Sequence, residues 1–162
     1  MRIGHGPGKP NRYHWKGTDQ IAELFKMLAA RYGSDVAYDV LPQMPHAEML
    51  SAQQKYHIWV DQICPAHEVI AYPPYRGGLD KVGLEAMAAG CAVVTSGGPL
   101  RIGDSVEEPP AVLTNPATAL VQLSQLIEDG DKRNTLADAG RQWVRKVCNP
   151  EAVATAVVGG MT

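Results

Sequence analysis

The sequence of 162 residues predicts an α/β fold in which a doubly wound parallel sheet lies between two layers of helices. Short hydrophobic stretches alternate along the chain with amphipathic stretches of roughly 10 to 15 residues, a pattern typical of βαβ units. The hydrophobic stretches lack regular alternation with polar residues, as expected of parallel strands that are covered on both faces. The length is that of one domain, so we expect residues 1–162 to fold as a single unit.

The first half of the chain contains three predicted strands and two predicted helices. Strands are expected at residues 2–6, 35–41 and 57–61. A helix is expected from Thr18 to Gly33, with Thr18 as its N-cap. Its predicted core face consists of apolar residues at helical spacing: Ile21, Leu24, Phe25 and Leu28. A second helix is expected at 45–56, with a proline in its first turn.

The second half continues the alternation after a long loop at 62–78 that contains three prolines. A helix is expected at 79–89, followed by strands at 91–96 and 111–115. The segment 116–146 is expected to form two helices that separate near Gly130, and a last helix is expected at 150–158.

Composition and charge exclude several classes of protein. No apolar run approaches the roughly 20 residues of a membrane helix, and the start of the chain lacks the apolar segment of a signal peptide, so we expect a cytoplasmic protein. A net charge of −2 with scattered basic residues predicts no nucleic-acid partner. The three cysteines, Cys64, Cys91 and Cys148, are widely spaced and are expected to be reduced and buried thiols.

A ligand site is expected at one edge of the predicted sheet. In doubly wound sheets, ligands bind beyond the carboxyl ends of the strands, where helix N-termini present free N–H groups to anions. The loops that reach this edge are predicted at 6–17, 42–46, 62–78 and 96–104. Among the five histidines, which show no metal-ligand spacing, only His5 is expected near this edge.

Glu85 is the one carboxylate within the small, apolar stretch GLEAMAAGCAVVTS. On a helix that begins near Leu79, residues Leu79, Val82, Gly83 and Ala86 share the face toward the sheet, and Glu85 lies at its margin. Two interpretations are open. Glu85 forms an ion pair with Lys81 one turn earlier, or it accepts hydrogen bonds from a pair of ligand hydroxyls such as those of a ribose.

The motifs KGTD and EAMAAGCAVV, followed by the tail LIEDGDKRNTLADAGRQWVRKVCNPEAVATAV, cover most of the chain in one order. In this they resemble the C-terminal, donor-binding domain of the retaining glycosyltransferases of the family 4 type, also called glycosyl transferases group 1. The resemblance implies a Rossmann-like, three-layer α/β/α domain that is half of a GT-B fold. The implied ligand is a nucleoside-diphosphate sugar as donor substrate, with no other cofactor and no metal in this domain.

The resemblance also implies roles for individual residues. Arg12 and Lys16 correspond to the basic residues that bind the donor diphosphate, and concentrated positive charge suits that anion. Gly77, Gly78 and Leu79 lead into the helix whose first N–H groups approach phosphate, and Glu85 corresponds to the glutamate that contacts the ribose hydroxyls. Gly77 stands where many members have a second, donor-facing glutamate, so no catalytic residue is assigned.

Enzymes of this family also have an N-terminal domain that binds the acceptor, and this sequence begins at the first strand of the second domain. Three interpretations follow: the donor-binding subunit of a split transferase, a fragment of a longer enzyme, or a non-catalytic binding module for a nucleotide or nucleotide-sugar. Transfer requires donor and acceptor held together with water excluded, so we expect the isolated chain to be inactive without a missing domain or partner.

Overall fold

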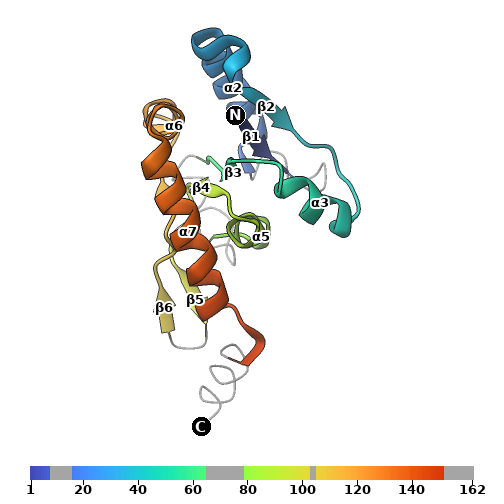
Figure 1. Cartoon of the computed structure of the whole chain (residues 1–162), viewed down its shortest axis with the longest axis vertical. Coiled ribbons are helices and arrows are strands. Elements are labelled where there is room, and N and C mark those ends of the chain that lie inside the picture. Colours follow the sequence, from blue (N-terminus) through green and yellow to red (C-terminus); the bar gives the residue numbers. More distant parts are fainter. Residues whose placement is uncertain (8–15, 65–78, 103–104, 152–162) are drawn as a thin grey trace.

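A five-stranded parallel sheet forms the centre of the molecule (Figure 1). The computed structural model describes residues 1–7, 16–64, 79–102 and 105–151. The strand order is β2-β1-β3-β4-β7. These strands are β1 (Arg2–His5), β2 (Ala37–Val40), β3 (Ile58–Gln62), β4 (Ala92–Thr95) and β7 (Val112–Leu113). The predicted α/β class and doubly wound parallel sheet are therefore confirmed.

Five α-helices connect and cover the strands in the described part of the chain. They are α2 (Thr18–Tyr32), α3 (His46–Gln53), α5 (Lys81–Ala89), α6 (Ala119–Glu128) and α7 (Gly130–Val147). A short 3-10 helix, η2 (Gly33–Asp35), follows α2. The predicted break between the last two of these helices, near Gly130, is confirmed.

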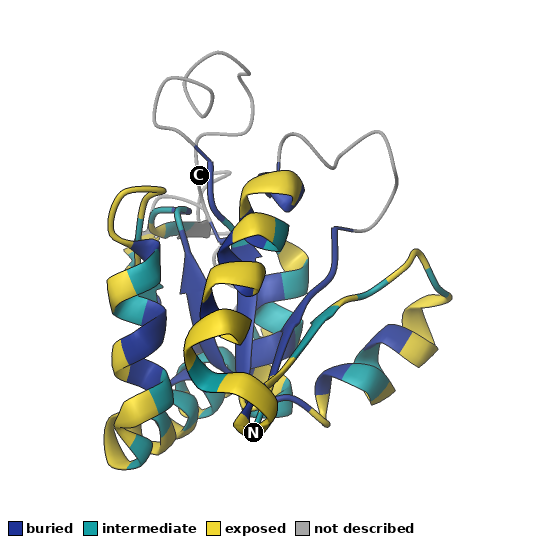
Figure 2. Cartoon of the chain, turned by 90° about the horizontal axis from the view of Figure 1, so that it is seen from above, coloured by how far each residue is buried: buried dark blue, intermediate teal, exposed yellow. Residues whose placement is uncertain are grey.

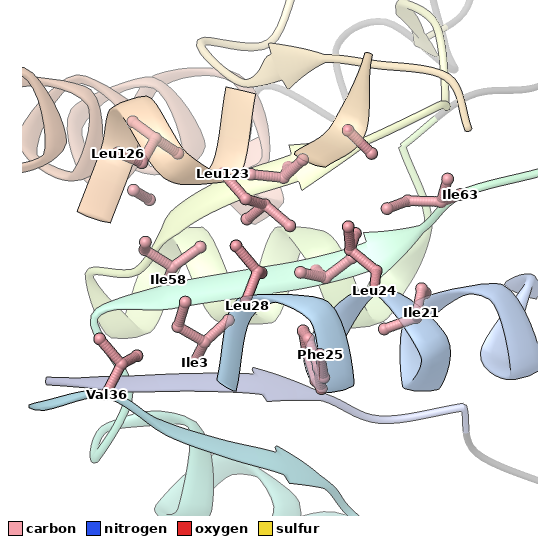
Figure 3. Packing of buried hydrophobic residues seen from close by; sticks show 14 residues of the cluster. Ile3, Ile21, Leu24, Phe25, Leu28, Val36, Ile58, Ile63, Leu123 and Leu126 are labelled. Atoms are coloured by element: carbon pink, nitrogen blue, oxygen red, sulfur yellow. The ribbon is translucent and has the colours of Figure 1, made fainter. Parts of the chain in front are cut away.

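The two faces of the sheet bury separate hydrophobic clusters, because successive strand residues point to opposite sides. On one face, α2 and α6 pack over Ile3, Ile58 and Val60, as Figure 3 shows for the residues it labels. On the other face, Trp59 and Val93 pack against α3 and α5, and α7 closes this side. In Figure 2 the central strands are largely dark blue and the outer surfaces of the helices are yellow, so the core is the centre of the sheet between its helical layers, whereas β2 and β7 at its two edges are less buried. The predicted core residues of α2 are all buried.

The direction of winding reverses between β1 and β3. The chain runs from β1 outward to β2 and then returns to the other side of β1, where β3, β4 and β7 follow. In such sheets the crevice beyond the carboxyl ends of the strands at this reversal is the usual ligand site.

Three local expectations differ from the structure. Thr18 is not the N-cap of α2: the cap is Gly17 in a left-handed conformation, and no side chain caps this end. Residues Leu100–Ile102 and Ser105–Glu107 form an antiparallel pair, β5 and β6, where a loop is expected to extend to residue 104. Helix α5 begins at Lys81 rather than at residue 79, with Asp80 as its N-cap. Most of the predicted loop 62–78 and of the last helix lies outside the described residues.

Candidate functional site at the carboxyl edge of the sheet

Lys16 and Gly17 lie against the end of β3. The Ile63 amide donates a hydrogen bond to the Lys16 carbonyl at 3.1 Å. Gly17 has φ +66°, and a Cβ atom on it would come within 2.0 Å of the Ile63 carbonyl oxygen. Only glycine fits a left-handed position with backbone so close, so the KG pair is required to bring Lys16 to this edge.

The Lys16 ammonium lies between two carboxylates. Its Nζ is 2.7 Å from Asp61 Oδ1 and 2.7 Å from Asp80 Oδ2. The Lys16 side chain is 6% exposed and that of Asp61 is fully buried, whereas the Asp80 side chain is 35% exposed. Burial acts to lower the pKa of Lys16, but the charges and hydrogen bonds of Asp61 and Asp80 outweigh it and raise the pKa above its ordinary value. Lys16 is therefore a cation at neutral pH, and its charge is balanced from both sides.

Asp61 lies at an irregularity in the pairing of β3 with β4. The register shifts between Val60 and Gln62, which places the Asp61 side chain among polar donors. Its Oδ2 accepts from Thr95 Oγ1 at 3.3 Å and from the Asp80 amide at 3.4 Å. A Cβ on Gly83 would lie 3.1 Å from the Asp61 Cγ, so the glycine lets the first turn of α5 approach the carboxylate.

The residues at the start of α5 complete the hydrogen-bond network around Asp61. Asp80 caps the helix by accepting from the Lys81 amide and also pairs with Lys16. Leu79, just before the helix, is buried, and its amide donates to the Gly98 carbonyl at 3.3 Å. The structure therefore joins the end of β3 and the segment after β4 to the N-terminus of α5.

Glu85 lies one turn further along α5, and its side chain is 14% exposed. Its Oε1 is 2.7 Å from Nε2 of His46, at the start of α3, and 3.5 Å from Nζ of Lys81. The marginal place expected for Glu85 agrees with this burial. The ion pair with Lys81 is present, and the stronger contact, with His46, was not anticipated.

His5, at the carboxyl end of β1, is fully buried with both ring nitrogens engaged. Nδ1 is 2.8 Å from the Val60 carbonyl oxygen and Nε2 is 3.0 Å from Thr18 Oγ1. Because a carbonyl only accepts, Nδ1 carries the proton and Nε2 accepts from the Thr18 hydroxyl. Burial lowers the pKa of His5 to about 4, so the ring is neutral and joins β1 to α2 and β3.

The structure places three of the six residues assigned to the ligand site. Lys16 pairs with Asp61 and Asp80, Leu79 is buried directly before Asp80, and Glu85 lies on the same helix that Asp80 caps. Arg12, Gly77 and Gly78 lie outside the described residues. Sequence reasoning missed Asp61, Asp80 and His46. The only signal for Asp61 is a lone carboxylate inside the hydrophobic stretch HIWVDQ, since a charge within a buried strand needs a partner.

Two further observations concern the described residues alone. None of their helices is long and apolar enough to cross a membrane. They contain no group of three or more His, Cys, Asp or Glu side chains that could hold a metal ion. Cys64, Cys91 and Cys148 form no disulfide within the described residues; Cys64 and Cys91 are buried as expected, whereas Cys148 is partly exposed.

Comparison with known proteins bears on the fold. No protein-family model matches the sequence, and no curated protein matches it. Among solved structures, the chain is similar to the C-terminal domain of a glycosyl transferase group 1 family protein from Francisella tularensis, with a TM-score of 0.57 and 19% identity over 93% of this chain and 87% of that one.

The chain is also similar to sucrose-phosphate synthase from Thermosynechococcus elongatus, with a TM-score of 0.59 and 17% identity over 99% of this chain. It spans 44% of that chain, less than half of its length. At these identities the likeness concerns the fold, which is that of the C-terminal domain of a GT-B protein, as the resemblance in sequence implies.

Proposed function

We propose that this domain binds the nucleoside-diphosphate sugar of a glycosyltransferase and acts as its donor-binding half. The observation that carries the proposal is the position of Lys16 beside the N-terminus of α5, at the reversal of the sheet. An ammonium group beside the N-terminus of a helix at such an edge is suited to a diphosphate. The two GT-B neighbours support the same assignment through the fold.

The spacing along α5 suits the rest of the ligand. From Asp80 to Glu85 the helix rises about 7.5 Å, which is comparable to the reach from a diphosphate to the hydroxyls of its ribose. Glu85 is partly exposed and pairs with an exposed His46, so ligand hydroxyls have access to this carboxylate. The proposed roles are therefore diphosphate binding at Lys16, with Arg12, and ribose binding at Glu85.

The two carboxylates around Lys16 determine how a diphosphate would enter. Asp61 is fully buried and accepts from several donors, so it stays in place. Asp80 is the more exposed partner, and a phosphate oxygen would replace its contact with Lys16. Binding then exchanges one anion for another at the ammonium, which predicts modest affinity in the absence of other donor contacts.

Titration calorimetry at low salt tests the proposal with UDP, GDP and ADP, free and linked to sugars. We expect at least one of them to bind in the millimolar range or tighter, and Glu85→Gln to weaken nucleoside diphosphate binding more than pyrophosphate binding. Glu48→Gln is the matched control, because Glu48 is an exposed carboxylate on α3. Failure of the whole panel to bind would refute donor binding, and equal weakening of both ligands would remove Glu85 from the ribose site.

A second function has one observation in its favour. Gly77 stands where many members of the family that the sequence resembles have a donor-facing glutamate, and this suits a non-catalytic binding module for a nucleotide or nucleotide-sugar. A transfer assay separates the alternatives. The isolated chain is expected to show no multiple-turnover transfer; turnover that appears on addition of an acceptor-binding domain or subunit supports a split transferase, and binding that no partner converts to turnover supports the module.

A further inference from the structure

A basic cavity lies at the opposite edge of the sheet from Lys16. Its walls come from the segment before β3, the end of α5 and the first half of α7. Residues 54–57 precede β3, and Ala89 and Gly90 precede β4, so in a parallel sheet both segments lie at the amino ends of the strands. Figure 1 shows α7 running beside α5 on this side. The cavity has a volume of about 230 Å³.

The ionisable side chains with nitrogen groups that line this cavity are cations or, for its histidine, become cations on protonation. It is lined by Lys55, His57, Arg133 and Arg141 together with amide side chains, and no carboxylate is among the lining residues. Within the described residues, Arg141 forms an ion pair with the exposed Asp138 at 3.9 Å. Burial lowers the pKa of His57, and nearby positive charge, including that of Arg133, lowers it further. The three cations Lys55, Arg133 and Arg141 favour an anion, against the weaker partial negative charge of the C-terminal end of α5 at Ala89 and Gly90.

The donors of the cavity are incompletely used by the described part of the chain. Arg133 Nη1 donates to the Leu126 and Ile127 carbonyls at 2.7 and 3.3 Å, but its Nε is buried without a hydrogen-bond partner among the described residues. Buried donors without partners are rare, and a bound water or ion is one of the explanations for such a group. His57 Nδ1 accepts from the Arg2 amide at 3.2 Å, which leaves Nε2 as the protonated nitrogen.

Gly90 makes room for the second guanidinium. It ends α5 in a left-handed conformation with φ +92°, and a Cβ there would come within 1.8 Å of an Arg141 terminal nitrogen. Arg141 thus lies directly over the backbone at the end of α5. Guanidinium groups recognise phosphate oxygens through paired N–H groups, and two of them in one cavity match a phosphate better than a carboxylate peptide or a metal.

We propose that this cavity is a second anion site, which binds a phosphate group either as free phosphate or as a small phosphate monoester. The volume is below the roughly 300 to 1,000 Å³ of typical ligand pockets, which suits a phosphate with a small attached group. The site is separate from the proposed diphosphate site, since the two lie at opposite ends of the strands.

Amide chemical shifts of the full chain test the proposal during titration with inorganic phosphate, against chloride at equal ionic strength. Saturable shifts are expected at Gly90, Asn134 and Arg141 in the millimolar range. Arg141→Gln and Lys55→Gln are each expected to weaken phosphate binding, Arg141→Gln by about tenfold, the loss of a charge-assisted hydrogen bond. Arg145→Gln, which removes the same charge from an exposed position of α7 outside the cavity, is expected to change nothing.

Comparison with a hexose monophosphate identifies the source of the phosphate. Tighter binding of the ester at the same amides indicates an esterified ligand, and equal affinity indicates the phosphate group alone. The proposal is overturned if phosphate causes no shift at these amides, if the shifts occur only near Gly17 and Gly83, or if Arg141→Gln and Lys55→Gln bind phosphate as the wild type does. Thermal unfolding of each variant shows whether it remains folded under the conditions of titration.

Discussion

Asp61 and Lys16 form a buried ion pair at the carboxyl edge of the sheet. Each also has further polar partners: Asp80 for Lys16, and Thr95 and the Asp80 amide for Asp61. Breaking such a buried pair by removing one partner costs about 3 to 5 kcal/mol, because the other charge is left uncompensated. Asp80 is the outer partner, with its side chain 35% exposed. The two carboxylates therefore differ in role: Asp61 keeps Lys16 in place, and Asp80 shields it.

Asp80→Asn is expected to strengthen diphosphate binding. Asparagine is as good an N-cap as aspartate, so α5 keeps its start while one negative charge beside Lys16 is removed. The affinity for pyrophosphate, measured by calorimetry, is expected to rise on the order of threefold or more, because the ligand no longer competes with a carboxylate. Glu23→Gln, which removes an exposed carboxylate of α2 outside both proposed sites, is the control for overall charge. Weaker binding by Asp80→Asn would show that the aspartate assists the ligand rather than opposing it.

His5 makes the stability of the chain dependent on pH. Its pKa is about 4 in the folded chain and 6.5 in the unfolded chain, so between these values the unfolded state binds the proton and the folded state does not. The contribution of His5 to the free energy of unfolding is therefore fully present above pH 6.5. It is lost as the pH decreases toward 4, and this loss lowers the free energy of unfolding by about 3 kcal/mol.

Urea unfolding of His5→Gln at pH 7 and pH 4 measures this contribution. The variant is expected to be less stable than the wild type at pH 7, because two buried hydrogen bonds are altered, and the difference is expected to shrink by about 3 kcal/mol at pH 4. His57→Gln, which changes an exposed ring, serves as the control and should alter the pH dependence less. A difference that stays constant with pH would contradict a neutral His5.

At the scale of elements, the pattern of hydrophobic residues predicts where strands and helices lie but not how their ends are closed. Helix α2 shows this most clearly. The spacing of Ile21, Leu24 and Phe25 predicts its buried face correctly, whereas Thr18 is engaged by His5 instead of capping the helix. The Thr18 hydroxyl donates a hydrogen bond to His5 in β1. Capping preferences describe only neighbouring residues, so they do not predict this tertiary contact.

Gly17→Ala tests the turn that delivers Lys16. Alanine in a left-handed conformation costs about 1 to 2 kcal/mol at any position, but at Gly17 its Cβ also meets the Ile63 backbone, which is held by β3. We expect Gly17→Ala to destabilise the chain by roughly 3 kcal/mol or more in urea unfolding.

Gly90→Ala is the matched comparison, since Gly90 is also left-handed but the three atoms nearest to its Cβ would all belong to the guanidinium of Arg141, the far end of a long side chain. Its expected cost is about 1 to 2 kcal/mol. If the two variants lower the free energy of unfolding equally, the backbone at Gly17 can shift to accommodate a Cβ, and the turn does not fix the position of Lys16.

For the whole molecule, alternation and strand composition were enough to predict the parallel sheet and its helical layers, whereas ligand binding at the carboxyl edge stays a prediction. The individual contacts of that edge were not predictable, because Asp61 meets Lys16 and Asp80 only after three separate segments converge. The partner of Glu85 likewise comes from α3, a helix 39 residues away in sequence. The antiparallel pair β5 and β6 is not predicted, because strands of three residues are too short to show a hydrophobic pattern.

The two edges of the sheet differ in charge. The carboxyl edge holds a lysine balanced by two aspartates, and the amino edge holds a cavity lined by arginines and a lysine. A nucleoside diphosphate carries negative charge and could be drawn to either edge, so affinity alone does not identify the site. The position of the bound ligand decides between them.

The most direct test of donor binding at the carboxyl edge is therefore a titration of the isotope-labelled chain with UDP, GDP or ADP, followed through its amide resonances. The predicted result is saturable shifts at Gly17, Gly83 and Glu85 for at least one nucleotide, with larger shifts at Glu85 than pyrophosphate causes. Shifts confined to Gly90, Asn134 and Arg141, or no shifts with any of the three nucleotides at millimolar concentration, would contradict a donor site at Lys16 and α5.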